Sequence, residues 1–141
     1  MNIAHFDGLI AAPFTPMHGN GDLNLQVIPG YYNMLKRNKV KAAFICGSTG
    51  EGVSLSMEEK KAVASAWANC TADDENFKVI MFLGGTCIAD CKELALHAQS
   101  EGLFAVSFTA PFYFKPANAK MLADCCVEIA SVVPDLPFYY Y

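Results

Sequence analysis

The stretch FICGSTGEG, residues 44–52, carries an apolar segment straight into a loop that is rich in glycine. Residues 47–52 contain three glycines together with Ser48, Thr49 and Glu51, which supply two hydroxyls and one carboxylate. A short apolar run followed by such a loop is typical of a buried strand that ends in a tight turn. The stretch therefore predicts a strand with a ligand-binding loop at its carboxyl end. A turn that needs glycine and nothing more is the alternative.

The same strand-and-helix unit recurs along the chain. Strands that alternate with helices form parallel sheets with right-handed crossovers. Two architectures remain open on this pattern: an open doubly wound sheet of the flavodoxin type, and part of an eight-stranded (β/α)8 barrel. In both, ligands bind at the carboxyl ends of the strands. The strands are predicted at residues 8–14, 42–46, 78–85, 104–109 and 137–141, with a helix between each consecutive pair.

Local signals mark the ends of the helices. The first helix is predicted to begin after Leu25, because Pro29 is tolerated only in a first turn. Ser56 and Glu59 have the spacing of a capping box, which opens the second helix. The third helix is predicted to stop at Gly102, which suits the position after a helix end. The fourth is predicted to end before a proline at position 134.

Length and composition predict one domain, residues 1–141, with no internal boundary. Hydrophobic residues make up 53% of the chain and charged residues 17%, a balance typical of strands that are covered on both faces. The net charge of −4 argues against a nucleic-acid partner. No run approaches the ~18 apolar residues of a membrane span, and the N-terminal stretch lacks the basic region of a secretory signal.

The six cysteines predict a reduced protein. None forms a CxxC pair or a zinc-finger set with histidine, so we expect a cytoplasmic location and no metal site. Cys87, Cys91 and Cys125 are predicted to lie on apolar stripes of the third and fourth helices. A free thiol in such a place behaves as a small hydrophobic group.

The glycine loop has the composition of an anion-binding turn. Consecutive backbone N–H groups that lead toward a helix form a small concavity that binds anions. Glycines at positions 47, 50 and 52 allow close backbone approach and positive φ angles. Ser48 and Thr49 add hydroxyl donors suited to a carboxylate or a single phosphate. The loop lacks the lysine of a P-loop and the spacing GxGxxG, so a nucleotide is not expected.

The sequence GSTGEG after a strand resembles the signature of the pyruvate-dependent class I aldolases, the family that includes N-acetylneuraminate lyase and dihydrodipicolinate synthase. The resemblance covers essentially the whole chain. GLIAAPFTPM with GDLN is similar to the first strand and loop of the family, APFYFKP to the end of its fourth strand, and LPFYYY to its fifth strand. Within the family, GEGVSLS and LPFYYY most resemble the animal-type N-acetylneuraminate lyases.

The resemblance implies a (β/α)8 barrel and the reversible aldol cleavage of sialic acid, N-acetylneuraminate, to N-acetylmannosamine and pyruvate. The reaction uses a lysine Schiff base and needs no cofactor or metal. Ser48 and Thr49 match the pair that binds the pyruvate-derived carboxylate, and Tyr141 matches the catalytic tyrosine. Tyr113 matches a tyrosine that lies near the active site across a subunit contact in some members, and a homotetramer is implied for the full-length protein.

The chain departs from the family pattern at one decisive place. The Schiff-base lysine of the family lies on the sixth strand, and none of the ten Lys and Arg residues here matches it. A complete barrel needs ~250 residues, so we expect residues 1–141 to form about the first four and a half units of one. Such a truncated domain is expected to expose its edge strands and to be inactive alone.

The origin and the function of such a piece both stay open. A fragment, a partly predicted gene and a truncated isoform are all compatible with the sequence. The functional alternatives are a sibling pyruvate aldolase such as dihydrodipicolinate synthase, and a catalytically dead form that acts only by binding.

Overall fold

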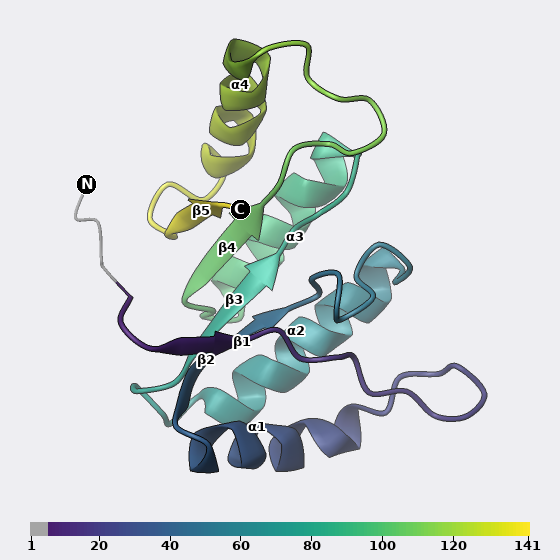
Figure 1. Ribbon diagram of the computed structural model, residues 1–141, viewed down its shortest axis with the longest axis vertical. Helices are drawn as coiled ribbons and strands as arrows, with labels where there is room; N and C mark the ends of the chain where they lie inside the picture. Colours follow the sequence, from purple (N-terminus) through teal and green to yellow (C-terminus); the bar gives the residue numbers. More distant parts are fainter. Residues whose placement is uncertain (1–5) are drawn as a thin grey trace.

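The computed structural model describes residues 6–141, which form one parallel sheet and a layer of helices (Figure 1). The predicted domain of residues 1–141 therefore includes five residues that lie outside the described part. The strands are β1 (Leu9–Ala11), β2 (Val40–Ile45), β3 (Lys78–Phe82), β4 (Ala105–Phe108) and β5 (Phe138–Tyr140). The helices are the 3₁₀ turn η1 (Leu25–Val27), α1 (Ile28–Arg37), α2 (Met57–Thr71), α3 (Ile88–Ser100) and α4 (Ala119–Ala130).

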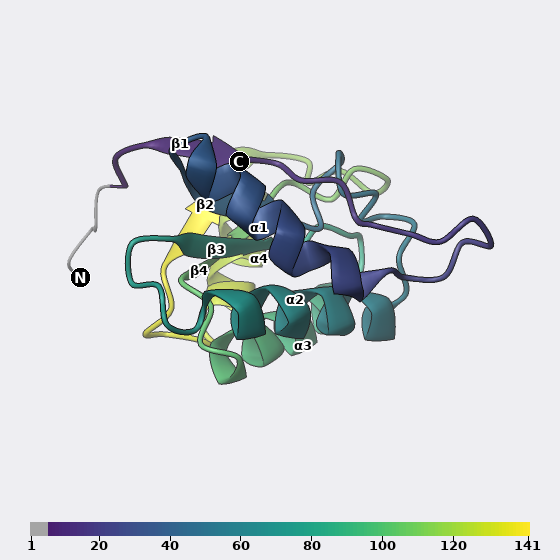
Figure 2. The ribbon, with the colours of Figure 1, turned by 90° about the horizontal axis from the view of Figure 1, so that it is seen from below.

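The order of the strands distinguishes between the two predicted architectures. The strands lie in the order β1-β2-β3-β4-β5, and each pairs in parallel with the next. The helices pack on one another in the same order, and both views show them following the outside of the curved sheet (Figures 1 and 2). A doubly wound sheet would reverse its direction and carry helices on both faces. The fold is therefore part of a (β/α)8 barrel.

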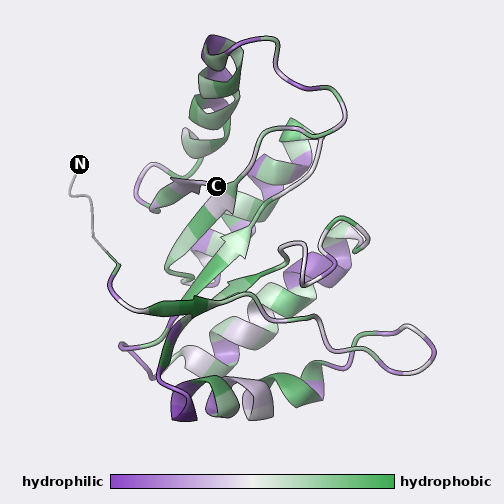
Figure 3. Ribbon diagram, viewed as in Figure 1, coloured by the Kyte–Doolittle hydropathy of each residue, from purple (hydrophilic) through white to green (hydrophobic). Residues whose placement is uncertain are grey.

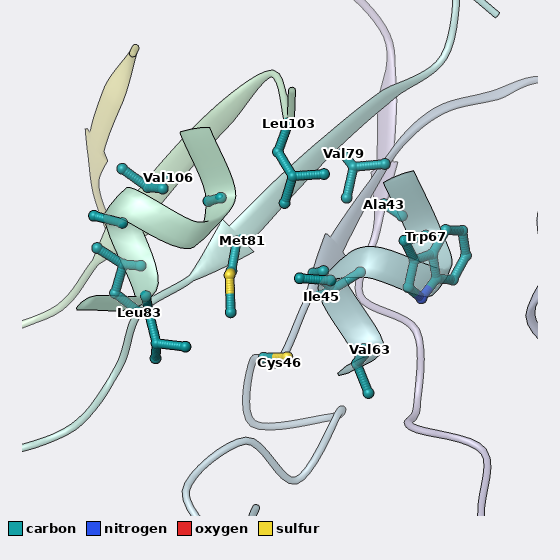
Figure 4. Close-up of a cluster of buried hydrophobic side chains, with 14 of the residues drawn as sticks. Ala43, Ile45, Cys46, Val63, Trp67, Val79, Met81, Leu83, Leu103 and Val106 are labelled. Atoms are coloured by element: carbon teal, nitrogen blue, oxygen red, sulfur yellow. The ribbon is translucent and has the colours of Figure 1, made fainter. Parts of the chain in front are cut away.

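The main core lies between the sheet and the helices. Ile45 of β2 and Val79 and Met81 of β3 face Val63 and Trp67 of α2, and none of these side chains is more than 3% exposed (Figure 4). Figure 3 shows the strands as mainly apolar and the helices as mixed, as expected for helices that bury one face and expose the other. The helix layer is thus held to the sheet by a continuous apolar core.

The predicted helix ends are confirmed. The 3₁₀ turn begins at Leu25, and Pro29 lies in the first turn of α1. The Ser56 hydroxyl accepts from the Glu59 N–H at 3.2 Å, and the Ser56 N–H donates to the Glu59 carboxylate at 2.8 Å, so the capping box is complete. Gly102 has a φ of 71°, the left-handed conformation that follows a helix end.

Two strands are shorter than predicted. β1 stops at Ala11 instead of position 14, and β3 stops at Phe82, because residues 83–85 already turn toward α3. Cys87 is exposed at the residue before α3 and does not belong to its apolar stripe, whereas Cys91 is buried. Cys125 is half-buried on α4. Within residues 6–141, no helix is both long and apolar enough to cross a membrane.

Candidate active site

A cavity of about 410 Å³ opens on the inner face of the sheet, the face that carries no helices. Residues 47–49, which follow β2, line one side of it, and Tyr141, which follows β5, lines another. The floor is apolar and includes Phe44 and Ile80. The ring centroids of Phe44 and Tyr141 are 5.9 Å apart, although two strands separate β2 from β5 in the sheet. Curvature of the sheet thus brings the two strand ends around one space.

The loop at residues 47–52 is closed by its own backbone. The Gly52 N–H donates to the Gly47 carbonyl and the Glu51 N–H donates to the Ser48 carbonyl, each at 3.1 Å. A Cβ atom on Gly52 would lie 1.8 Å from the Cys46 carbonyl oxygen, so only glycine fits there. Within the described residues, the N–H groups of Ser48 and Thr49 donate no hydrogen bond, and both side chains are exposed. These donors remain available to an anion in the cavity.

The loop glycines do not use the positive φ angles that glycine allows. In this loop the left-handed conformation falls on Cys46, with a φ of 58°, and on Glu51, with a φ of 55°, and not on the three glycines. The glycines are needed for space, since Gly50 and Gly52 both pack against the backbone of Cys46. The strain at Cys46 persists because that residue is buried in the core.

Cys46 cannot act as a nucleophile. Burial raises the pKa of its thiol to about 12, and the nearby Lys60 offsets only part of that effect. A thiol with so high a pKa carries almost no thiolate at neutral pH. The residue therefore belongs to the core, where it packs beside Met81 and Ile45 (Figure 4).

Tyr141 is held by the sheet through its backbone. Its N–H donates to the Phe108 carbonyl at 3.0 Å, which continues the pairing of β5 with β4. The side chain is 82% exposed and turns toward the cavity that Ser48 and Thr49 also line. The structure thus brings together three of the four predicted site residues.

Tyr113 lies apart from these three. It belongs to the exposed loop between β4 and α4, is 75% exposed, and does not line the cavity. Its ring meets the ring of Phe114 edge-on, with the centroids 4.8 Å apart. Together with Phe112, these side chains form an exposed aromatic cluster on the carboxyl side of β4.

Two polar residues near the site were missed by the sequence reasoning. Ser107 of β4 is 1% exposed, lines the cavity, and donates to the Tyr139 carbonyl at 3.1 Å. Thr15 is 6% exposed and donates to the Gly50 carbonyl at 2.7 Å. A hydroxyl inside the buried run AVSF, and a threonine between prolines in PFTP, were the available signals.

The described lining of the cavity contains no amine. Among residues 6–141, no lysine lines it. In the same part of the chain, no cluster of three or more His, Cys, Asp or Glu side chains could hold a metal ion. The described residues therefore offer donors for an anion and a phenol, but no amine.

Comparisons with known proteins find the same fold with a related sequence. Residues 5–141 match the dihydrodipicolinate synthetase family. The chain is 42% identical over 135 residues to N-acetylneuraminate lyase of Danio rerio, covering 95% of this chain and 44% of that protein. The corresponding figures for N-acetylneuraminate lyase of Homo sapiens are 41%, 95% and 42%.

Solved structures of N-acetylneuraminate lyases have the same fold as this chain. The structure of Proteus mirabilis N-acetylneuraminate lyase superposes with a TM-score of 0.91 at 38% identity, covering 96% of this chain and 45% of that one. N-acetylneuraminate lyase from Aliivibrio salmonicida gives a TM-score of 0.92 at 35% identity, with 99% and 46% covered. The chain thus spans less than half the length of these relatives.

Proposed function

The chain belongs to the dihydrodipicolinate synthetase family, and on this premise we propose that it carries the substrate-carboxylate site and the catalytic tyrosine of an N-acetylneuraminate lyase. The observation that carries the proposal is that Ser48, Thr49 and Tyr141 line one cavity at the carboxyl ends of β2 and β5. In this proposal, residues 1–141 are one domain that forms part of the barrel of that enzyme.

The proposed reaction divides the work among these residues. The free N–H groups and hydroxyls of Ser48 and Thr49 hold the carboxylate of the pyruvyl part of the substrate. The amine of a lysine condenses with the adjacent carbonyl carbon to form an imine with loss of water, and the protonated imine accepts the electron pair when the carbon–carbon bond breaks. Tyr141 takes the proton of the hydroxyl on the carbon that becomes the aldehyde, and returns it in the reverse direction. Because no lysine lines the cavity among residues 6–141, the imine-forming lysine comes from outside them.

A chimera tests the proposal. Residues 1–141 are joined to the part of Danio rerio N-acetylneuraminate lyase that lies beyond the matched region. We expect the chimera to cleave N-acetylneuraminate, and the variant Tyr141→Phe to lose about 10²–10⁴-fold in kcat, the usual contribution of an acid–base group. Tyr31→Phe is the matched control, because that ring packs between Phe14 and Trp67, away from the cavity. A folded chimera whose Tyr141→Phe variant keeps full activity would contradict the assignment.

A second candidate is a protein that binds a pyruvyl carboxylate without turning it over. The absence of a cavity-lining lysine among residues 6–141 favours it for this chain on its own. Borohydride reduction of the chain in the presence of pyruvate, followed by mass spectrometry, is expected to leave the mass unchanged. A stable adduct would show that one of the lysines in this chain forms the imine.

The aromatic cluster supports a further part of the proposal, a homotetramer of the full-length protein. Phe112, Tyr113 and Phe114 are each more than half exposed, which is unusual for three consecutive aromatic residues. A subunit contact would cover them and would bring Tyr113 toward the site of a neighbour. The six cysteines are free thiols, which supports a cytoplasmic location.

A further inference from the structure

Thr15 joins the segment that follows β1 to the candidate carboxylate loop. Its hydroxyl donates to the Gly50 carbonyl at 2.7 Å across 35 positions of sequence, and the pair is buried. A Cβ atom on Gly50 would lie 3.2 Å from the Pro13 carbonyl oxygen, so the same segment also packs directly on the loop. The middle of the loop thus rests on residues 13–15.

The segment that carries Thr15 is itself rigid. Pro13 and Pro16 fix two φ angles, and Pro16 also confines Thr15 to extended conformations. The Pro16 carbonyl accepts from the Asn24 N–H at 2.8 Å, and Met17 pairs with Leu23 in an antiparallel bridge. The Thr15 hydroxyl therefore approaches Gly50 from a fixed position.

The bond complements the contacts that the loop makes within itself. The hydrogen bonds from Glu51 and Gly52 back to residues 47 and 48 close the loop, but they leave its position relative to the cavity undetermined. The hydrogen bond from the Thr15 side chain to the Gly50 carbonyl joins the loop to a segment outside it. Gly50 directly follows Ser48 and Thr49, so holding its carbonyl group limits how far the preceding peptide groups can rotate.

We infer that Thr15 is a positioning residue, which holds the loop at residues 47–52 so that the Ser48 and Thr49 donors face the cavity. Thr15 does not line the cavity and acts through Gly50. The carboxylate part of this inference rests on the proposed function, whereas the fixing of the loop does not depend on it.

Four proteins test the inference: the 141-residue chain and its variants Thr15→Val, Thr15→Ser and Thr71→Val. Valine keeps the shape of threonine and removes the hydroxyl, and serine restores the hydroxyl. Thr71→Val is the matched control, because the Thr71 hydroxyl donates to the Trp67 carbonyl at 2.9 Å, at the far end of α2. The two readouts are amide hydrogen exchange and the affinity for pyruvate.

In Thr15→Val we expect the exchange of the Glu51 and Gly52 amides to quicken about tenfold more than that of the β3 amides. We also expect the affinity for pyruvate to fall about tenfold, as for the loss of one buried hydrogen bond. Thr15→Ser is expected to restore both, and Thr71→Val to change neither selectively. Uniform quickening across β3 and the loop in Thr15→Val, or no rescue by serine, would overturn the inference.

The two hypotheses fail in different ways. If the unaltered chain does not bind pyruvate, the carboxylate site is contradicted, while the exchange of the loop amides still decides whether Thr15 fixes the loop. If the chain binds pyruvate and Thr15→Val binds it equally well, the carboxylate site stands and the role of Thr15 is overturned.

Discussion

The two faces of the sheet are built from the same strands but differ in how far their side chains are buried. On the outer face, Val79, Met81 and Val106 are buried under the helices at 3% exposure or less. On the inner face, Phe44 and Tyr139 are only half-buried, and Ile10 is 45% exposed. The inner face is therefore less completely covered within residues 6–141, although Ile80 of β3 and Ser107 of β4 are buried there at 4% and 1% exposure.

Ion pairs also link the neighbouring helices that cover the outer face. Lys61 of α2 forms an ion pair with Glu93 of α3 at 2.5 Å, and Lys92 of α3 forms one with Glu128 of α4 at 2.6 Å. Among the described residues, the inner face has no such pair, and its hydroxyls and phenols face the cavity. The difference indicates that the outer face supplies most of the stability of this chain, whereas the inner face supplies its chemistry.

The largest expected effect tests this division directly. Trp67→Ala removes a side chain that is 1% exposed in the outer core, and we expect it to lower the free energy of unfolding by about 3–5 kcal/mol. Phe44→Ala removes a half-buried ring from the inner face and is expected to cost about 1–2 kcal/mol. Urea unfolding followed by circular dichroism measures both. Equal losses would mean that the inner face is as well packed as the outer one.

A smaller effect is expected in the loop at residues 47–52, beside the inner face. Gly52→Ala places a methyl group 1.8 Å from the Cys46 carbonyl, so the loop must open, at an expected cost of about 1–3 kcal/mol. The matched control is Gly19→Ala, since a Cβ atom on Gly19 meets nothing within 4 Å. We expect the control to change stability by less than about 0.5 kcal/mol. Equal stability of the two variants would show that the loop adapts without strain.

The fold could be predicted from the sequence because its signals are local and repeated. Apolar runs, the capping box at Ser56 and the glycine at position 102 each mark an element through contacts only a few residues away. The strand order could not be read in this way. Both candidate architectures use the same alternation, and only the pairing of β1 with β2 and the single helix layer distinguish them.

The site was predictable to a similar extent. Ser48, Thr49 and Tyr141 were identified by resemblance, and their common cavity followed from the rule that ligands bind at the carboxyl ends of parallel strands. Thr15 and Ser107 were missed, because their roles depend on bonds to residues 35 and 32 positions away. The positive φ angles of the loop, at Cys46 and Glu51, could not be read from the sequence, since its glycines relieve crowding and not torsional strain.

A cluster at the amino end of the sheet gives the outer layer a dependence on pH. The Asp74 carboxylate lies 2.6 Å from the Lys36 ammonium and accepts from the Tyr32 hydroxyl at 2.6 Å. The bonds from Lys36 and then Tyr32 hold the pKa of Asp74 at about 2, below its ordinary value. A carboxyl group whose pKa is lowered by folding stabilises the protein above its unfolded pKa of about 3.9 and loses that effect as the pH falls toward the folded value.

The expected result is a loss of stability between pH ~5 and pH ~2 that is steeper in the unaltered chain than in Asp74→Asn. The neighbouring Asp73→Asn is the matched control, because Asp73 is exposed and makes no hydrogen bond or ion pair within residues 6–141. Urea midpoints measured across this pH range give the comparison. Parallel curves for Asp74→Asn and the unaltered chain would mean that the cluster does not couple α1 to the turn before β3.

The smallest expected effect concerns backbone strain in the turn between α1 and β2. Lys39 follows the end of α1 with a φ of 61°, and its N–H donates to the Lys36 carbonyl at 2.9 Å. Glycine adopts this conformation without the cost that other residues bear, so Lys39→Gly is expected to raise stability by about 0.5–1 kcal/mol. Lys41→Gly, at an exposed position of β2, is the control and is expected to lower stability by a similar amount. If both variants are destabilised alike in urea unfolding, the turn between α1 and β2 is held by the lysine side chain and not by its backbone. In that case, contacts of exposed side chains would stabilise the outer layer in addition to its buried packing.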